Sequence, residues 1–179
     1  MIEAVVFDLD GILIHSEEVW DSVRERYVRE RGGRYDDEVQ RAMMGMSSPE
    51  WSRYLHEHAS VPDAPEEINA EVVRRMLAAY REELPLADGA VEAVQRLAAR
   101  WPLGLASSSN RPLIDTVLEL AGLTASFRVT VSSEEVERGK PAPDVYLEAA
   151  RLLGVGPGAC AAIEPSTTSA AASASSPGG

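Results

Sequence analysis

Two aspartates, separated by one residue, stand at the end of the first apolar segment of the chain. Asp8 and Asp10 follow the apolar run of residues 4–7, and Gly11 comes directly after them. A short β-branched run without polar alternation is typical of a strand buried on both faces, as in the parallel sheet of an α/β protein. Ligands of such sheets bind beyond the carboxyl ends of the strands. Since side chains two residues apart lie on the same side of an extended chain, both carboxylates are predicted at a ligand site.

Two carboxylates held this close repel each other unless a positive charge lies near them. A hard divalent cation such as Mg²⁺ fits, because proteins hold it with one or two carboxylates and substrate phosphate. A plain turn at Gly11 would explain one aspartate and leave the second without a reason. A calcium loop would need glycine at its sixth position, whereas Gly11 comes only three residues after Asp8.

The string Phe7-Asp8-Leu9-Asp10-Gly11 resembles the first motif of the haloacid dehalogenase superfamily, in its phosphatase and phosphomutase branch. The resemblance implies that Asp8 is the nucleophile that forms an aspartyl phosphate, and that Asp10 is the general acid and base. Both roles agree with general chemistry, since carboxylates serve as covalent nucleophiles and as proton donors and acceptors. Members that act on haloacids or phosphonates lack an acid at the position of Asp10, so the resemblance favours a phosphatase.

The composition is that of an ordinary globular protein, because the 179-residue chain has 45% hydrophobic and 26% charged residues. The net charge of -12 argues against nucleic acid or an anionic membrane as the main partner, since both require basic surface. A single cysteine, Cys160, leaves no internal disulfide and fits a reducing compartment. With no long apolar run and no basic leader, the sequence predicts a cytoplasmic protein.

From about residue 15 to residue 85 the hydrophobic pattern is helical. Four amphipathic helices joined by short loops are typical of a small bundle. The large apolar side chains of this stretch are interpreted as core: Trp20, Met43, Met44, Met46 and Trp51. The predicted helices cover residues 17–31, 36–44, 48–59 and 65–84.

This helical block interrupts the α/β pattern after the first strand, and it is similar to the C1 cap of the haloacid dehalogenase superfamily. The resemblance implies that the block lies over the strand ends. Such a cap excludes water and selects substrates, and its expected hinges lie near residues 13–16 and 84–88.

A second group of candidates follows another buried strand, predicted over residues 102–106. This strand ends at Ser107-Ser108-Ser109-Asn110, directly before a predicted helix. Strand end, hydroxyls and helix N-terminus together form an anion site, because free backbone N–H groups and the helix dipole favour a phosphate there. Serines before a helix are also common caps. Ser107 is similar to the second motif of the family, which implies that it binds the phosphoryl group, with Ser108 and Asn110 as further phosphate-binding candidates.

Lys140 is the only lysine in a chain with 17 basic residues. It lies in Gly139-Lys140-Pro141, after a third strand predicted over residues 127–131 and before a helix over residues 144–153. A fixed ammonium suits the charge of a transferring phosphoryl group. The alternative is a surface lysine in a turn. The string is similar to the third motif of the family, which implies that Lys140 holds phosphoryl oxygens.

A fourth strand is predicted over residues 159–163, and Glu164 follows it. In the family this place carries a pair of acids that completes the Mg²⁺ site. The resemblance therefore implies that Mg²⁺ is held by Asp8, the carbonyl oxygen of Asp10 and Glu164. Pro165 stands where the second acid is expected, which predicts weaker metal binding.

The predicted fold class is α/β: a Rossmann-like parallel sheet flanked by helices, of the haloacid dehalogenase type, with an inserted four-helix cap. The core comprises residues 1–14 and 86–164, and the cap comprises residues 15–85. Residues 165–179 contain only Pro, Ser, Thr, Ala and Gly, which predicts a low-complexity tail. Because relatives continue with a helix and a strand, the C-terminal part of the core is expected to be truncated.

These observations predict a Mg²⁺-dependent phosphatase, a monomer or weak homodimer, that hydrolyses a small phosphorylated metabolite such as a sugar or polyol phosphate. One alternative is a phosphomutase similar to β-phosphoglucomutase, which shares every core motif. Such mutases carry an arginine and a histidine where this chain has Ser48 and Trp20, and a cap lysine that this chain lacks. A second alternative is an inactive family member that only binds ligand, and Pro165 supports it.

Overall fold

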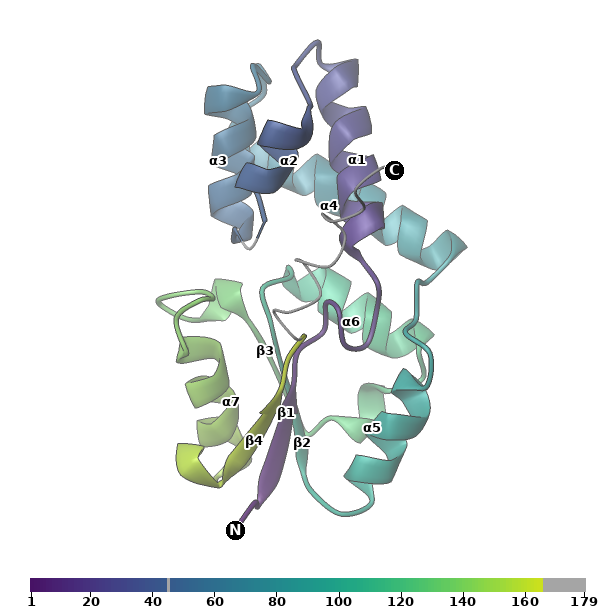
Figure 1. The fold of residues 1–179 in the computed structure, drawn as a ribbon, viewed down its shortest axis with the longest axis vertical. Coiled ribbons are helices and arrows are strands. Elements are labelled where there is room, and N and C mark those ends of the chain that lie inside the picture. The colour runs from purple at the N-terminus through teal and green to yellow at the C-terminus, as the bar shows by residue number, and fades with distance from the viewer. Residues whose placement is uncertain (45, 166–179) are drawn as a thin grey trace, which may run out of the picture.

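Four parallel strands form the centre of the computed structural model, which describes residues 1–44 and 46–165 (Figure 1). In chain order they are β1 (Ala4–Phe7), β2 (Leu103–Ser107), β3 (Val129–Ser132) and β4 (Cys160–Ile163). The spatial order is β3-β2-β1-β4, and each neighbouring pair is parallel. The carboxyl end of β1 is therefore flanked by the ends of β2 and β4.

Alternate residues of the strands enter two different cores. Val5 and Phe7 of β1 pack in a cluster with residues of α5 and α6, whereas Val6 and Ala106 pack against α7. Since side chains alternate across a strand, a strand covered on both faces needs an unbroken apolar run, as β1 has. Figure 1 shows α7 on one side of the sheet and α5 on the other. These helices are α5 (Ala90–Ala98), α6 (Arg111–Leu120) and α7 (Asp144–Leu153).

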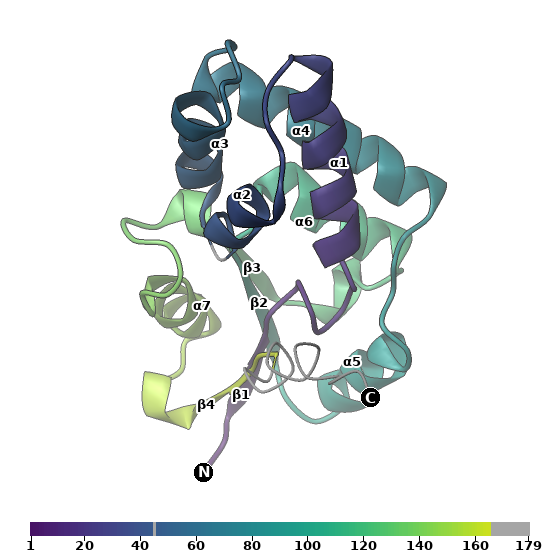
Figure 2. The same ribbon diagram turned by 45° about the horizontal axis from the view of Figure 1, so that its top comes forward.

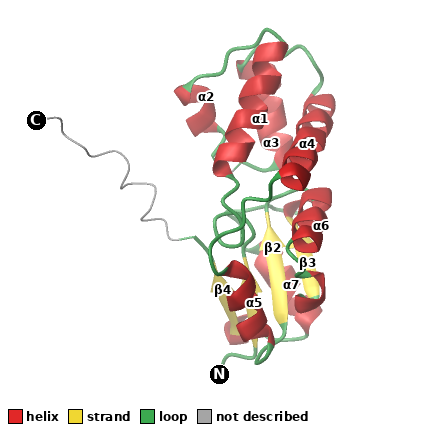
Figure 3. Ribbon diagram, turned by 90° about the vertical axis from the view of Figure 1, so that its right-hand side faces the viewer, coloured by secondary structure: helices red, strands yellow, loops and turns green. Residues whose placement is uncertain are grey.

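The chain between β1 and β2 forms four further α-helices among the described residues. They are α1 (Glu17–Glu30), α2 (Asp37–Ala42), α3 (Ser48–His58) and α4 (Pro65–Glu82), together called the helical insertion below. The insertion lies beyond the carboxyl ends of the strands, as Figures 2 and 3 show from two further directions. Its buried side chains, among them Tyr27, Leu55 and Ile68, belong to the same hydrophobic cluster as Phe7.

Local capping signals set where two of these helices begin. The Asp36 carboxylate accepts hydrogen bonds of 3.1 Å from the backbone amides of Glu38 and Val39 at the start of α2. At the start of α3, the Glu50 carboxylate accepts a hydrogen bond of 2.7 Å from the amide of Ser47. The second contact defines the N-terminus of α3, directly before Ser48.

Two paired segments connect the helical insertion to the sheet. The amide of His15 donates to the carbonyl of Pro85 at 2.8 Å, and the amide of Ala87 donates to the carbonyl of Leu13 at 2.9 Å. The chain therefore leaves the sheet and returns to it through neighbouring, hydrogen-bonded segments. The hinges predicted near residues 13–16 and 84–88 fall on these segments.

The predicted fold class is confirmed, with small differences at element ends. The third strand begins two residues later than predicted, at Val129. Phe127, predicted within it, instead packs its ring edge-on against Phe7, with the ring centroids 5.8 Å apart. Three short 3₁₀ helices were not predicted: Thr124–Ser126, Ser133–Glu135 and Pro157–Ala159.

Most of the predicted tail, residues 166–179, lies outside the described residues. The expected truncation of the core therefore stays a prediction. Among the helices that the structure describes, none combines the length and the hydropathy needed to traverse a lipid bilayer.

Candidate active site

The carboxylate of Asp8 lies just beyond β1 and faces the ammonium of Lys140. Nζ of Lys140 is 2.8 Å from Oδ2 of Asp8, and the two side chains are only 16% and 14% exposed. The amide of Leu9 donates to the other Asp8 oxygen at 2.7 Å. The amide of Asp8 donates to the carbonyl of Ile163 at 2.9 Å, which ties this residue to β4. The loop that carries the only lysine thus brings its charge to the end of the first strand.

The Asp8 carboxyl has a shifted pKa, and the Lys140 ammonium keeps N–H donors for a further acceptor. Burial raises the pKa of Asp8 more than the charge of Lys140 lowers it, so the pKa of this carboxyl lies above its ordinary value. Nζ of Lys140 is buried, and among the described residues it has no hydrogen bond of good geometry. Because the ammonium carries three donors, N–H groups remain for a further acceptor such as a phosphoryl oxygen.

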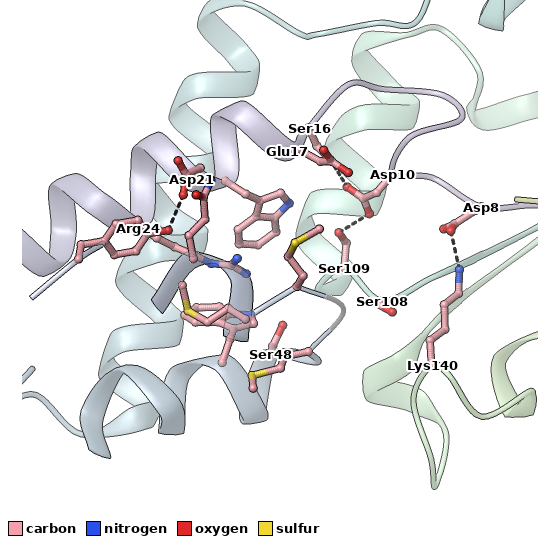
Figure 4. Close-up of a pocket in the computed structure, with 17 residues that line it drawn as sticks. Asp8, Asp10, Ser16, Glu17, Asp21, Arg24, Ser48, Ser108, Ser109 and Lys140 are labelled. Atoms are coloured by element: carbon pink, nitrogen blue, oxygen red, sulfur yellow. Dashed lines mark hydrogen bonds and ion pairs between the residues drawn. The ribbon is translucent and has the colours of Figure 1, made fainter. Parts of the chain in front are cut away.

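Asp10 points toward hydroxyl groups rather than toward Asp8. Ser16 donates to Oδ1 of Asp10 at 2.5 Å, and Ser109 donates to Oδ2 at 2.9 Å. Ser107 donates to the same Oδ2 at 3.3 Å. Figure 4 shows Asp8 with Lys140, and Asp10 with Ser16 and Ser109. Different neighbours offset part of the repulsion between the two carboxylates, an ammonium for Asp8 and hydroxyls for Asp10, and the charge of Asp10 still raises the pKa of Asp8.

Ser107 and Ser108 take different positions at the end of β2. Ser107 is fully buried, and its Oγ accepts a hydrogen bond of 3.0 Å from the amide of Ser109 in addition to contacting Asp10. Ser108 lines the cavity beside Asp8. Ser108 is therefore the serine of this predicted pair whose side chain borders open space.

Asn110 is held between the helical insertion and the core. Its Oδ1 accepts a hydrogen bond of 2.8 Å from Ser48, and its Nδ2 donates to Oε1 of Glu134 at 2.7 Å. Asn110 is 4% exposed and is not among the residues that line the cavity. The structure does not bring its amide to the pocket, because these two partners on opposite sides occupy it. Its predicted phosphate contact stays a prediction.

Glu164 follows β4 and is linked to Lys140 through Tyr146. The hydroxyl of Tyr146 donates to Oε1 of Glu164 at 2.5 Å, and Nζ of Lys140 lies 4.8 Å from the centre of the Tyr146 ring. Burial and the hydrogen bond to Glu164 both raise the pKa of Tyr146, which keeps this hydroxyl a donor. Sequence reasoning missed Tyr146, because its spacing from Lys140 marks neither a motif nor a shared helical face.

Pro165 lies against the turn that follows Asp10. A Cβ atom placed on Gly11 would meet Cγ of Pro165 at 2.8 Å, and Gly11 has a positive φ of 78°. The glycine is thus required both by the backbone conformation and by the proline ring. Within residues 1–44 and 46–165, no group of three or more His, Cys, Asp and Glu side chains lies together as a metal cluster.

A cavity of about 360 Å³ lies between the strand ends and the helical insertion (Figure 4). Asp8, Asp10 and Lys140 line it at the sheet end. The insertion contributes, among others, Trp20, Arg24, Met43, Met46, Ser48 and Trp51. The large apolar residues interpreted as core are therefore also cavity wall, and Met44 is 63% exposed.

Arg24 also escaped the sequence interpretation, although a signal was available. Trp20 and Arg24 are four residues apart, so they share a helical face, and the guanidinium lies 4.5 Å from the Trp20 ring centre. A tryptophan and an arginine at this spacing, beside a predicted site, mark a face that is neither purely core nor purely surface.

Comparison with known proteins decides the family. The model of the haloacid dehalogenase-like hydrolase family matches residues 2–174. Hexitol phosphatase B of Escherichia coli (strain K12) is 33% identical over 178 residues, which cover 96% of this chain and 79% of that protein. The chain belongs to the haloacid dehalogenase-like hydrolase family. The predicted superfamily is thereby confirmed.

One further relative and one solved structure are similar to this haloacid dehalogenase-like hydrolase. The bifunctional riboflavin kinase/FMN phosphatase of Arabidopsis thaliana is 31% identical over 164 residues, covering 90% of this chain. The chain spans only 43% of the length of that longer protein. The crystal structure of CbbY from Rhodobacter sphaeroides in complex with phosphate matches with a TM-score of 0.82 and 26% identity, covering 94% of this chain and 80% of that one.

Proposed function

We propose that this haloacid dehalogenase-like hydrolase is a Mg²⁺-dependent phosphatase that cleaves a small phosphate monoester through an aspartyl phosphate on Asp8. The observation that carries the proposal is the buried Asp8 carboxylate, 2.8 Å from the ammonium of Lys140 and open to a cavity. A nucleophile beside a fixed cation is the arrangement that phosphoryl transfer needs. The phosphatase names of two relatives, hexitol phosphatase B and the FMN phosphatase, support the same reaction class.

In the proposed reaction, Lys140 holds a phosphoryl oxygen while an oxygen of Asp8 attacks phosphorus. The Asp8–phosphorus bond forms as the bond to the ester oxygen breaks, and Asp10 gives that leaving oxygen a proton. Asp10 then takes a proton from a water that attacks phosphorus, which frees Asp8 and inorganic phosphate. The hydroxyls of Ser16 and Ser109 hold the Asp10 carboxylate in place for both proton transfers.

The donors at the strand ends fit Mg²⁺ in kind. Asp8 and Glu164 supply carboxylates from neighbouring strands, and Asp10 supplies a backbone carbonyl. Mg²⁺ needs only one or two carboxylates when water and substrate phosphate fill its other positions. When bound, the ion would neutralise charge on the phosphoryl group. With Pro165 in place of a second acid, we expect weaker Mg²⁺ binding. A dissociation constant of about 1 mM or weaker, or about -4 kcal/mol, would favour the inactive, ligand-binding alternative.

We propose that residues 1–14 and 86–164 form the catalytic core and residues 15–85 a cap that excludes water from the cavity. A volume of about 360 Å³ is at the small end for ligand sites, which favours a compact substrate. A sugar or polyol phosphate fits this size, and the name of hexitol phosphatase B supports that class.

The decisive experiment is release of inorganic phosphate from an aryl phosphate, with and without Mg²⁺. Asp8→Asn should lower kcat by about 10³-fold or more, as removal of a covalent nucleophile does in other enzymes. Asp115→Asn, a change on the exposed side of α6, serves as the matched control. Hydroxylamine should trap the acyl phosphate on Asp8 during turnover. Equal activity of Asp8→Asn and the unchanged protein would refute the proposal.

The phosphomutase alternative finds less support. Trp20 stands where such mutases carry a histidine, and its ring contacts Arg24. Ser48 stands where they carry an arginine, and its hydroxyl donates to Asn110. Interconversion of glucose 1-phosphate and glucose 6-phosphate would reverse this ranking. Absence of any turnover, with ligand still bound, would favour the binding-protein alternative.

A further inference from the structure

The guanidinium of Arg24 lies in a corner formed by two indole rings of the helical insertion. Its Cζ is 4.5 Å from the centre of the Trp20 ring and 4.7 Å from the centre of the Trp51 ring. The two rings meet at a steep angle of 62°, with their centres 6.0 Å apart. Because two sides of the guanidinium are covered by aromatic carbon, its remaining N–H edge has a restricted direction.

Among the described residues Arg24 forms no ion pair, although the charges of Asp21 and Asp10 act on it. Nε of Arg24 is buried and has no hydrogen-bond partner in the part of the chain that the structure describes. Asp21, one turn earlier on α1, instead accepts a hydrogen bond of 2.6 Å from the hydroxyl of Tyr35. Burial lowers the pKa of Arg24 to about 10, so the group remains a cation at neutral pH.

The Arg24 side chain is partly buried, and its aromatic contacts offset only part of the cost of that burial. A cation–π contact stabilises a charged group weakly unless water is excluded from it. Removal of a charged group from water is unfavourable unless an opposite charge and hydrogen bonds replace the water. An anionic group of a ligand would therefore complete the environment of Arg24.

Arg24 lines the same cavity as Lys140, at the other end (Figure 4). Arg24 and Lys140 are the only cations among the described residues that line this cavity, and Asp8 already pairs with Lys140. A ligand whose phosphate lies in the cavity against Asp8 and Lys140 would therefore extend its far end toward Arg24.

We infer that the substrate carries a carboxylate at the end remote from its phosphate, and that Arg24 binds this carboxylate. The inference rests on the proposed phosphatase function and, in place of a neutral sugar or polyol phosphate, names the phosphate monoester of a short hydroxy acid as the substrate class. A guanidinium edge matches a carboxylate with two parallel N–H donors. Glu17 and Asp21 also line this end of the cavity, and they would repel a second phosphate more strongly than a singly charged carboxylate. Gln40 and Ser48 offer polar groups for the hydroxyls between.

The test measures kcat/KM for three phosphate monoesters of equal length, with Mg²⁺ and the full chain. One ester ends in a carboxylate, one in the corresponding neutral amide, and one in a second phosphate. The carboxylate ester should exceed the amide by roughly 10- to 100-fold, as expected when a hydrogen bond to a charged group is lost. Arg24→Gln should bring this ratio close to one, and Arg24→Lys should restore part of it.

Arg26→Gln is the matched control, because Arg26 is an exposed arginine of α1 that lies outside this cavity. It should leave the carboxylate-to-amide ratio unchanged. The ratio is independent of the fraction of folded enzyme, so a partly unstable Arg24 variant remains informative.

Each failure has its own signature. Ready turnover of all three esters at similar kcat/KM, or an unchanged ratio in Arg24→Gln, would overturn the inference and leave the phosphatase proposal standing. Preference for the second phosphate would overturn the choice of carboxylate. Turnover of none of the esters, nor of an aryl phosphate, would overturn the proposed function and this inference with it.

Discussion

The carboxylate of Asp8 lies 2.8 Å from the ammonium of Lys140, yet the pKa of Asp8 is raised. Burial is the largest cause, and it outweighs the attraction of the lysine. The ionised Asp8 carboxylate therefore lowers the stability of the folded state, as is common where a charged group is kept out of water for function.

The first prediction concerns the pH dependence of this penalty. A carboxyl group whose pKa is raised on folding stabilises the folded state at pH values below its unfolded pKa and loses that contribution as pH rises through its folded pKa. Asp8→Asn resembles the protonated acid at every pH, so it should melt at a higher temperature than the unchanged protein at pH 7. The difference should shrink as pH falls through the raised pKa. Thermal unfolding from pH 4 to pH 8 checks this.

The control for that series is Asp115→Asn, since Asp115 has an exposed side chain (62%). It should shift the melting temperature little at any pH. A lower melting temperature for Asp8→Asn across the whole range would show that the ion pair with Lys140 outweighs burial.

The second prediction concerns the hydrogen bond between Ser48 and Asn110, which joins the helical insertion to the core. Ser48→Ala should lower the free energy of unfolding by about 1–3 kcal/mol, because it leaves the buried Asn110 oxygen with an unmet hydrogen bond. Ser52→Ala is the matched control on the same helix. The Ser52 hydroxyl donates to the carbonyl of Ser48 within α3, so its loss should be smaller. Urea unfolding of both variants measures this, and equal losses would contradict a special role for the Ser48 contact.

The third prediction concerns Tyr146, whose hydroxyl holds Glu164 while its ring contacts Lys140. Tyr146→Phe keeps the ring and removes the hydroxyl. Partners that orient a metal ligand typically matter by 10- to 100-fold in affinity, so the Mg²⁺ concentration for half-maximal activity should rise by about 10-fold or more. Mg²⁺ titration of phosphate release checks this. An unchanged Mg²⁺ dependence would mean that Glu164 does not hold the metal.

The main elements of the fold were predictable from local patterns. Apolar residues at helical spacing and capping residues such as Asp36 mark the helices. An unbroken apolar run marks β1 as doubly covered. The topology rule that ligands bind at the carboxyl ends of parallel strands placed Asp8 at a ligand site. The resemblance of Gly139-Lys140-Pro141 to the third motif of the family placed Lys140 beside it.

The contacts that the sequence did not predict depend on how helices cross. Trp20 and Arg24 share a face of α1, but their meeting with Trp51 depends on the placement of α3. Tyr146 reaches Glu164 because α7 packs on the face of the sheet formed by β1, β2 and β3. Asn110 was predicted to bind phosphate, but its side-chain oxygen instead accepts a hydrogen bond from Ser48, which is 62 residues away in sequence. The spacing of apolar residues predicts which face of a helix is buried, but it does not predict which other element that face contacts.

The fourth prediction separates two effects at Gly11. Gly11→Ala combines an unfavourable φ of 78° with a close approach of 2.8 Å to Pro165. Gly89→Ala has a similar φ of 73° and no atom within 4 Å of the added Cβ, so it reports backbone strain alone. Strain of this kind costs about 1–2 kcal/mol, and Gly11→Ala should lose more than Gly89→Ala in urea unfolding. A smaller loss at Gly11 would mean that the proline ring moves aside freely.

The fifth prediction concerns the residue that replaces the second acid of the fourth motif. Pro165→Asp should lower the Mg²⁺ concentration for half-maximal activity by about 10-fold or more, since a second carboxylate joins Glu164 beside Asp8. Pro165→Asn has the same shape without the charge and should have a smaller effect. If both variants respond to Mg²⁺ as the unchanged protein does, position 165 lies outside the metal site.

The hydrogen bonds between His15 and Pro85 and between Ala87 and Leu13 have a consequence for how such a protein can diversify. Because the outgoing and returning segments are joined side by side, the sheet meets the helical insertion at one short junction. Helices can change in length away from this junction, provided that the buried side chains shared with Phe7 stay packed. The helices that select a metabolite can therefore change during evolution while the residues at the strand ends that act on the phosphate stay the same.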